Sequence, residues 1–316
     1  MDATQGPVNF LELRVCGLQH SGNHAIIDWI MVQHEGAPIC FLNNVRHGDS
    51  DPFTSATQSQ SMNLGPRSDV ENIRRKQKKL LIYSYEDDLG KMDECDSFLD
   101  SVFDADFEKN RSVVLGDSQH RIDLLIIRDP FNFLASRVKS LDSLSGIKDM
   151  DAIVENWKSL ALETINFEGN PEAGRMAINY NSWFVDESYR RKLSARLHGK
   201  YSDKSLATVS GLGGGSSFNS TEYSPLTFDV IRKKWRKLFD PRTYLRVDHY
   251  LKRLRATGAQ NMNVLERWRE MEDNSLFQSV FSDQSVLELS EEVFGEFPGT
   301  RLFVDNCRRM LSECGR

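Results

Sequence analysis

The sequence predicts an α/β protein built on a parallel sheet of about five strands flanked by helices. Two continuous apolar runs, 79–85 and 121–127, have the length and composition of strands that are buried on both faces of a parallel sheet. A third run, 11–16, is apolar at alternate positions and leads through a short polar turn into a helical pattern. This alternation of strand and helix patterns along the chain is typical of α/β folds.

The turn after the first strand, residues 17–24 (Gly-Leu-Gln-His-Ser-Gly-Asn-His), is the most informative segment. A polar turn that ends at a helix start directs backbone N–H groups toward one point, where the helix dipole favours an anion. The turn lacks the lysine and the magnesium-binding hydroxyl of the Gly-x-x-x-x-Gly-Lys-Ser/Thr pattern of nucleoside triphosphatases. We therefore expect it to hold a phosphate-like group without metal. Four apolar side chains of the following helix share one stripe: Ile26, Ile27, Ile30 and Met31.

Polar residues follow the later strands. The strand 79–85 is followed by three acidic residues, the strand 121–127 by an Arg-Asp-Pro sequence, and a fourth strand is expected at 176–180. Ser136, in the helix after Arg128, is expected to close on the same anion as Arg128. Ligands of doubly wound sheets sit beyond the carboxyl ends of the strands. Four residues are predicted to meet there: Gly17, Glu86, Arg128 and Tyr180.

The remaining segments are assigned more coarsely. Helical spacing is present at 149–164, and a charged helix is expected at 186–197. The stretch 47–68 is rich in Ser, Gln, Thr and Asp, and we expect it to be a mobile loop or disordered insertion that gates an acceptor. Basic and aromatic residues are interleaved in a helical insertion at 229–260. A pair of amphipathic helices is favoured there over a surface for nucleic acid, an anionic acceptor or a protein.

Composition limits the class of protein. The chain has 316 residues and a formal net charge of −6, which argues against general nucleic-acid binding. It contains no apolar run of 18 residues, and residues 1–9 lack the features of a signal peptide. Five dispersed cysteines indicate reduced thiols, with Cys16 buried in the first strand. We expect a cytoplasmic protein with a single domain over 1–316, without nucleic-acid or membrane partners; a homodimer is left open.

Three segments follow one another along the chain: the turn 17–24, the Arg-Asp-Pro strand end at 128–130 and a glycine-rich stretch at 209–218. In this order they resemble the motifs of the sulfotransferases that use 3′-phosphoadenosine 5′-phosphosulfate (PAPS). The resemblance implies that the first loop wraps the 5′-phosphosulfate, that Arg128 and Ser136 bind the 3′-phosphate, and that the glycine-rich stretch closes over the nucleotide. The implied cofactor-binding residues are Gln19, His20, Ser21, Gly22, Asn23, His24, Ala25, Arg128, Ser136, Tyr180, Ser210, Gly213, Gly214, Gly215, Ser216 and Ser217.

The resemblance implies that the enzyme transfers a sulfuryl group from PAPS to a hydroxyl or amino group of a small molecule, such as a bacterial secondary metabolite. The product of the donor would be adenosine 3′,5′-bisphosphate (PAP), and no metal would be required. Glu86 is the first candidate for the general base, with Asp87 and His24 as alternatives. His20 stands where the family has Lys or Arg and is expected to assist the leaving phosphate. Asn23 and His24 replace the family's two hydroxyl residues.

Two other classes of function stay open. A metal-assisted kinase or nucleotidyl transferase would share the sheet and the loop, although it should carry the missing lysine and an acidic strand end for magnesium. A nucleotide-binding module without catalytic activity would keep the fold and lack a base. A helix that covers the nucleotide is expected to start within 264–268.

Overall fold

The computed structural model describes residues 8–65, 69–87, 98–103, 105–140, 150–169, 174–206, 265, 267–271 and 274–314. The predicted glycine-rich loop, with its six candidate residues Ser210, Gly213, Gly214, Gly215, Ser216 and Ser217, lies outside the described residues, and so does the predicted basic insertion 229–260.

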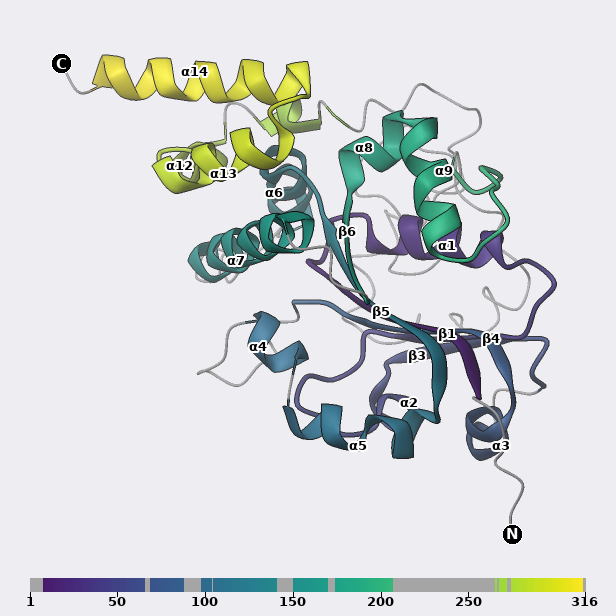
Figure 1. The fold of residues 1–316 in the computed structure, drawn as a ribbon. Coiled ribbons are helices and arrows are strands. Elements are labelled where there is room, and N and C mark those ends of the chain that lie inside the picture. Colours follow the sequence, from purple (N-terminus) through teal and green to yellow (C-terminus); the bar gives the residue numbers. More distant parts are fainter. Residues whose placement is uncertain are drawn as a thin grey trace, which may run out of the picture.

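The fold is an α/β structure around one six-stranded sheet, which confirms the predicted class (Figure 1). The strand order is β3-β2-β4-β1-β5-β6, and every neighbouring pair is parallel except β2 and β3. All four strands expected by range are present, and β2 and β3 complete the sheet. Their bounds are β1 Asn9–Gly17, β2 Ile39–Asn43, β3 Gln58–Met62, β4 Lys78–Tyr85, β5 Ser118–Ile127 and β6 Arg175–Asn179.

The register brings the carboxyl ends of the central strands to the same level. Cys16 of β1 lies beside Tyr85 of β4, and Gly17 lies beside Ile126 of β5. Ile127 of β5 in turn pairs with Asn179 of β6. The segments that follow these strands therefore meet at one edge of the sheet, as parallel topology requires.

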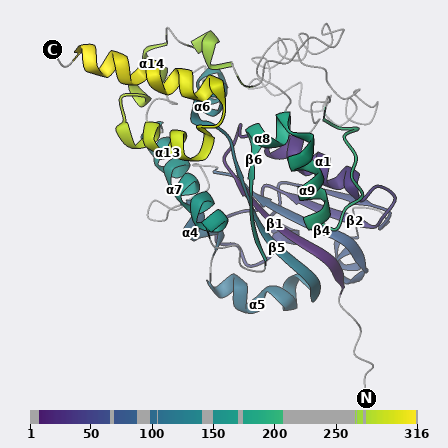
Figure 2. The same cartoon turned by 45° about the horizontal axis from the view of Figure 1, so that its top comes forward.

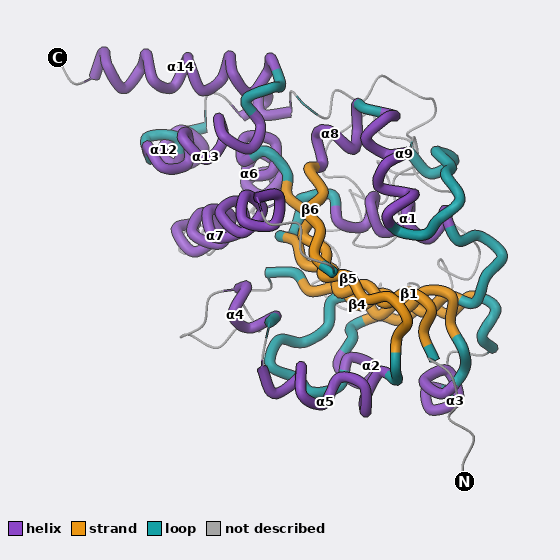
Figure 3. The backbone as a smooth tube through the Cα atoms, in the orientation of Figure 1, coloured by secondary structure: helices purple, strands orange, loops and turns teal. Residues whose placement is uncertain are grey.

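One face of the sheet is covered by three helices, α1 Asn23–Gln33, α8 Tyr180–Val185 and α9 Glu187–Arg196 (Figures 1 and 3). Because alternate residues of a strand point to opposite faces, β1 presents its apolar set to this side. Leu11, Leu13 and Val15 pack there against Ile26 and Ile30 of α1. The predicted apolar stripe of the first helix is thus a core face, and Asp186 caps the charged helix α9 by accepting the Ser188 N–H.

The other face is also covered by helices. They include α2 Pro52–Ser55, α3 Val70–Arg75, α4 Phe98–Val102 and α5 Ala105–Leu115. The longer α6 Pro130–Ser140 and α7 Met150–Gly169 lie toward the carboxyl edge, where the last elements of the chain pack beside them (Figure 2). These last elements are η4 Arg267–Met271, α12 Ser275–Val280, α13 Gln284–Phe294 and α14 Pro298–Cys314.

The segment around Trp268 is tied to α6. Asn132 donates an Nδ2 hydrogen bond to the Leu265 carbonyl, and the Trp268 N–H donates to Asn132 Oδ1. The buried Trp268 ring meets Phe303 edge to face. The helix expected to start within 264–268 is therefore a short 3₁₀ turn, η4, that joins the core beside α6. No helix in the described parts of the chain has the length and apolar character that crossing a membrane requires.

The stretch 47–68, predicted to be a mobile loop or disordered insertion, contains regular structure at 52–55 and 58–62. This stretch forms α2 and the edge strand β3, which pairs antiparallel with β2. The Asp51 side chain caps α2 by accepting the Phe53 N–H at 3.0 Å, and Phe53 enters the core. The strand β3 itself (Gln-Ser-Gln-Ser-Met) is held by main-chain pairing, so it needs no apolar pattern and composition does not reveal it. Gating of an acceptor by this segment stays a prediction.

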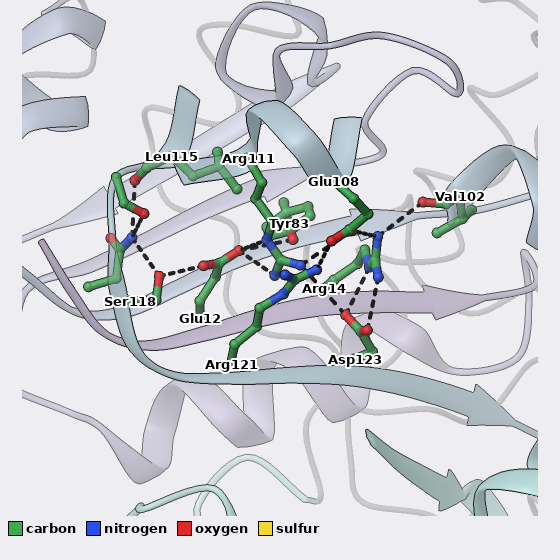
Figure 4. Close-up of polar contacts among 12 residues, drawn as sticks. Glu12, Arg14, Tyr83, Val102, Glu108, Arg111, Leu115, Ser118, Arg121 and Asp123 are labelled. Atoms are coloured by element: carbon green, nitrogen blue, oxygen red, sulfur yellow. Dashed lines mark hydrogen bonds and ion pairs between the residues drawn. The ribbon is translucent and has the colours of Figure 1, made fainter. Parts of the chain in front are cut away.

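The second face of β1 carries a buried ionic network rather than an apolar surface (Figure 4). Arg14 forms a bidentate pair with Asp123 of β5, through Nε–Oδ1 and Nη2–Oδ2 distances of 2.9 Å. Glu12 accepts from Arg111 of α5 at 2.5 Å and from the Tyr83 hydroxyl at 3.0 Å. The network holds three carboxylates and three guanidinium groups: Glu12, Glu108, Asp123, Arg14, Arg111 and Arg121.

We predict that Arg111→Met lowers the free energy of unfolding by roughly 3–5 kcal/mol, because it leaves the buried Glu12 carboxylate without its cation. The double variant Glu12→Leu/Arg111→Met should recover most of this loss, since it removes both charges. Urea unfolding measures both changes. Lys204→Met, which breaks the exposed pair with Glu35, is the control and should change stability by less than about 1 kcal/mol. A double variant as unstable as Arg111→Met would contradict this account.

Candidate functional site

The loop between β1 and α1, residues 18–22, is the centre of the candidate site. The Ser21 N–H donates to the Leu18 carbonyl at 3.1 Å, which closes the turn. His20 has a φ of 71°, an uncommon conformation for a residue with a side chain, and Gly22 has a φ of 87°. Gly22 is also the N-cap of α1 and carries no side chain to accept the first N–H groups of that helix. These amides therefore remain available to an anion.

At two positions of the site, neighbouring side chains come so close to the backbone that only glycine fits. A Cβ on Gly22 would lie 2.2 Å from Cε2 of Tyr180, the first residue after β6, so the Tyr180 ring packs directly on the loop. A Cβ on Gly17 would lie 2.3 Å from Oδ1 of Asn23, because the Asn23 side chain folds back over the loop. Asn23 Nδ2 donates to the Leu18 carbonyl at 2.9 Å.

A buried carboxylate, Asp87, anchors the loop from the end of β4. Its Oδ1 accepts the Gln19 N–H at 2.6 Å, and its Oδ2 accepts from Arg137 Nη2 of α6 at 3.1 Å. Arg137 Nη1 also donates to the Gln19 carbonyl at 3.3 Å. Desolvation raises the pKa of Asp87 to about 6, against the opposing effects of the Arg137 charge and the Gln19 N–H. With no exposed surface and both oxygens engaged, Asp87 has the surroundings of a structural anchor rather than of the general base for which it was an alternative.

Arg128 grips the same loop from the end of β5. Its Nη1 donates to the His20 carbonyl at 3.3 Å, and its guanidinium carbon lies 4.9 Å from the centroid of the Tyr180 ring. The backbone on either side of this contact is fixed as well. The Trp157 indole N–H donates to the Arg128 carbonyl at 3.0 Å, and Asp129 caps α6 by accepting the Asn132 N–H at 2.9 Å.

Ser136, which was expected to join Arg128 on one anion, is buried in α6. Its hydroxyl donates to the Asn132 carbonyl of its own helix at 2.9 Å. The side chain that α6 sends to the loop is that of the next residue, Arg137. Sequence reasoning missed this role of Arg137. Its place in the same helix seven residues beyond Pro130 was visible, but the helix pattern does not show which of two neighbours faces the loop.

Two guanidinium groups give the loop a positive potential. Desolvation, the Arg137 charge and the Arg128 charge together lower the pKa of His20 to about 4. His20 keeps an exposed surface, which weakens the desolvation effect. The repulsion between the two guanidinium charges and an added proton acts whether the ring is buried or exposed. His20 is therefore neutral at pH 7 in the unliganded protein. The same potential that repels a proton attracts an anion.

Some backbone N–H groups of the loop form hydrogen bonds within the turn and the helix, and others have no acceptor there. The Ser21 N–H bonds to Leu18 within the turn, and the Ala25 N–H donates to the Gly22 carbonyl at 3.0 Å. Ala25, expected to contribute to cofactor binding, thus uses its amide inside the helix. By helix geometry, Asn23 and His24 have no acceptor for their N–H groups within α1. The Ser21 hydroxyl is buried, and it has no hydrogen-bond partner among the described residues.

Glu86 and His24, the two other candidates for the base, lie next to each other. His24 Nδ1 is 3.9 Å from Glu86 Oε1, and Asn23 Nδ2 donates to the same oxygen at 3.1 Å. On its other side, His24 Nε2 lies 3.0 Å from Asn43 Oδ1 at the end of β2. His47 Nε2 contacts the Glu86 carbonyl at 2.8 Å. Both side chains are partly exposed, at 16% for His24 and 12% for Glu86, so a small molecule can reach them.

Asn43 and His47 were not predicted as site residues. Asn43 ends the apolar run Ile-Cys-Phe-Leu-Asn, which is strand β2. Had this run been recognised as a parallel strand, its carboxyl end would have marked Asn43 in the same way as it marked Glu86 and Arg128. His47 has no such signal in the sequence.

Comparison with known proteins gives little further information. No model of a known protein family matches this chain, and no curated protein matches it. Among solved structures, the chain is similar to the mouse sulfotransferase SULT7A1 complexed with PAP. The sequence identity is 11%, the match covers 86% of this chain and 87% of that chain, and the TM-score is 0.38. So distant a similarity supports no activity, which has to be inferred from the chain's own residues.

We predict that Asp87→Asn destabilises the protein by roughly 3–5 kcal/mol, because the buried Arg137 guanidinium loses its counter-charge. Amide hydrogen exchange at residues 19–24 should accelerate more than exchange in the strands, since the loop loses its anchor. Glu86→Gln, in the neighbouring and partly exposed position, serves as the matched control and should cost less than about 1 kcal/mol. Unchanged exchange in the loop of Asp87→Asn would show that Asp87 does not anchor it.

Proposed function

We propose that this chain is a PAPS-dependent sulfotransferase that transfers a sulfuryl group to a hydroxyl or amino group of a small molecule. One observation carries the proposal: a glycine-containing loop at the start of α1 is held by two guanidinium groups at the carboxyl edge of a parallel sheet. The loop is suited to a phosphate-type anion, and it has no lysine of the triphosphatase type. The ordered resemblance of three sequence motifs then favours a phosphosulfate nucleotide.

The residues present fit such a nucleotide. Arg137 and Arg128 bind the carbonyl groups of Gln19 and His20. These two contacts fix the peptide groups that carry the carbonyls, and the Ser21 N–H closes the same turn on the Leu18 carbonyl. The N–H groups at the uncapped start of α1 and the buried Ser21 hydroxyl form a cradle for anionic oxygens. PAPS, when bound there, would supply the sulfuryl group and a phosphate leaving group.

The chain's own residues would then orient and assist the transfer. The N–H groups at the start of α1 stabilise charge on anionic oxygens, which is the main contribution that a preorganised loop makes to catalysis. Neutral His20 can donate a ring N–H hydrogen bond to a leaving phosphate oxygen. Glu86 Oε1 and His24 Nδ1 are partly exposed beside the loop, which suits either group to take the proton of an acceptor, and Glu86 is the first candidate for the base.

We predict that PAP binds with the same affinity in the presence of magnesium or of EDTA, and that Arg128→Ala weakens binding by about 30- to 1,000-fold. Loss of one partner of a buried, charge-assisted contact costs roughly 2–4 kcal/mol. Isothermal titration with PAP and with ATP, each with and without magnesium, makes the measurement. Arg128→Lys keeps the charge without the planar fork and should lie between wild type and Arg128→Ala.

Arg191→Ala, on the exposed side of α9, is the control for this titration and should leave the affinity unchanged. Tighter binding of magnesium–ATP than of PAP would favour a kinase or nucleotidyl transferase and contradict the proposal. Unchanged affinity in both Arg128 variants would remove Arg128 from the nucleotide site.

Glu86→Gln is predicted to lower kcat by about 10²- to 10⁴-fold while PAP affinity changes only a few-fold, because the amide keeps the shape of the carboxylate but cannot accept a proton. Turnover can be followed by mass spectrometry of sulfated products over a panel of small phenols, alcohols and amines with PAPS as donor. Near-normal turnover in Glu86→Gln together with loss of turnover in His24→Ala would assign the base to His24. Normal turnover in both variants would move the chemistry away from this edge of the sheet.

A further inference from the structure

The two candidate bases, His24 and Glu86, lie in a cluster with two further polar side chains beside the loop. We call His24, Asn43, Ser84 and Glu86 the His24 cluster. It joins the carboxyl ends of β2 and β4 to the first turn of α1. The Asn44 N–H donates to Ser84 Oγ at 3.1 Å, Ser84 Oγ lies 3.2 Å from Asn43 Oδ1, and Asn43 Oδ1 lies 3.0 Å from His24 Nε2.

This chain of contacts favours one tautomer of the His24 ring. Ser84 Oγ accepts the Asn44 N–H and is free to donate its own hydrogen to Asn43 Oδ1. With the oxygen of the Asn43 amide on this side, His24 Nε2 has to be the donor, which leaves a lone pair on Nδ1. The reversed amide would require a proton on Nδ1, but at 3.9 Å that proton would form no hydrogen bond to Glu86. The network therefore favours the Nε2–H tautomer.

Two proton acceptors then face each other. Glu86 Oε1 is a carboxylate oxygen, and His24 Nδ1 has a lone pair, so the two atoms need donors from a third group. Asn23 Nδ2 donates one hydrogen bond to Glu86 Oε1, but no described contact joins Asn23 to His24. An alcohol can donate one hydrogen and would satisfy one acceptor. A primary ammonium group can donate to both, and its charge matches the carboxylate.

We infer that the acceptor of the proposed sulfuryl transfer is a primary amine, bound as ammonium between Glu86 Oε1 and His24 Nδ1, with Asn43 and Ser84 as positioning residues. The inference rests on the proposed function. The two acceptors also match the proton balance of the reaction. An ammonium loses one proton to become a nucleophile and a second after its nitrogen bonds to sulfur, while the sulfur–oxygen bond to the phosphate breaks and the electron pair leaves with that oxygen.

The tautomer is tested by two-bond ¹H–¹⁵N spectra of the full-length protein at pH 8, with the His24 signals assigned by comparison with His24→Gln. We expect Nε2 to carry the proton in wild type. Asn43→Leu removes the acceptor, and Ser84→Ala removes the donor that orients the Asn43 amide, so both variants should shift the ring toward a mixture of tautomers. A merely structural role of Asn43 would leave the tautomer unchanged. A wild-type ring protonated on Nδ1 would overturn the assignment.

The acceptor class is tested by titrating the full-length protein with benzylamine and, as its isostere, benzyl alcohol, and following the His24 ring nitrogens. Benzylamine is expected to shift the Nδ1 signal and to bind at least about tenfold more tightly than benzyl alcohol. Glu86→Gln should abolish most of this preference, whereas Asp49→Asn, an acidic residue outside the His24 cluster, should leave it intact. Equal or tighter binding of benzyl alcohol would overturn the inference.

Neither readout uses a nucleotide, so the two proposals fail separately. Loss of PAP binding in the titration of the preceding section would reject sulfuryl transfer while the tautomer and the amine preference could still be measured. Conversely, a protein that binds PAP but prefers benzyl alcohol at His24 would keep the proposed function and transfer to a hydroxyl group.

Discussion

The buried ion pair between Asp87 and Arg137 is the interaction on which the rest of the site depends. It joins the end of β4 to α6 and holds the loop after β1 from both sides, because Asp87 accepts the Gln19 N–H and Arg137 donates to the Gln19 carbonyl. A buried pair of this kind gains little net stability over an apolar contact, but the loss of either partner leaves a charge without compensation. The loop conformation, with His20 and Gly22 at positive φ, is maintained on this support.

The second consequence of the pair is electrostatic. Asp87 neutralises Arg137, yet the two arginines around the loop still lower the pKa of His20, so the potential at the loop stays positive. The arginines also act through their hydrogen bonds, because they hold the Gln19 and His20 carbonyl groups and so fix the turn that leads into α1. A loop without a triphosphatase lysine can thus attract an anion through its backbone and through cations placed behind it.

The sequence contains enough information for four of the six strands and for the loop, but not for the edge strand or for the partners of the buried charges. The runs at 79–85 and 121–127 were predicted correctly, because burial on both faces requires apolar residues. The edge strand β3 was not predicted, since its pairing depends on backbone groups alone. At the end of β4, Glu86 and Asp87 look equivalent in sequence, and only the position of Arg137 on a distant helix shows which one is buried. The network of Glu12 with Arg111 has the same origin, since α5 brings its partner from 99 residues away.

The central claim is that the loop at the start of α1, with Arg128, binds an adenosine bisphosphate through both of its phosphates. Phosphorus-31 NMR of PAP during titration with the full-length protein tests this directly, because the 3′- and 5′-phosphates give separate signals. The account predicts that both signals shift or broaden in wild type, with EDTA present, and that Arg128→Ala reduces the change at one phosphate more than at the other. Two signals that stay at their free positions at millimolar protein would contradict the account.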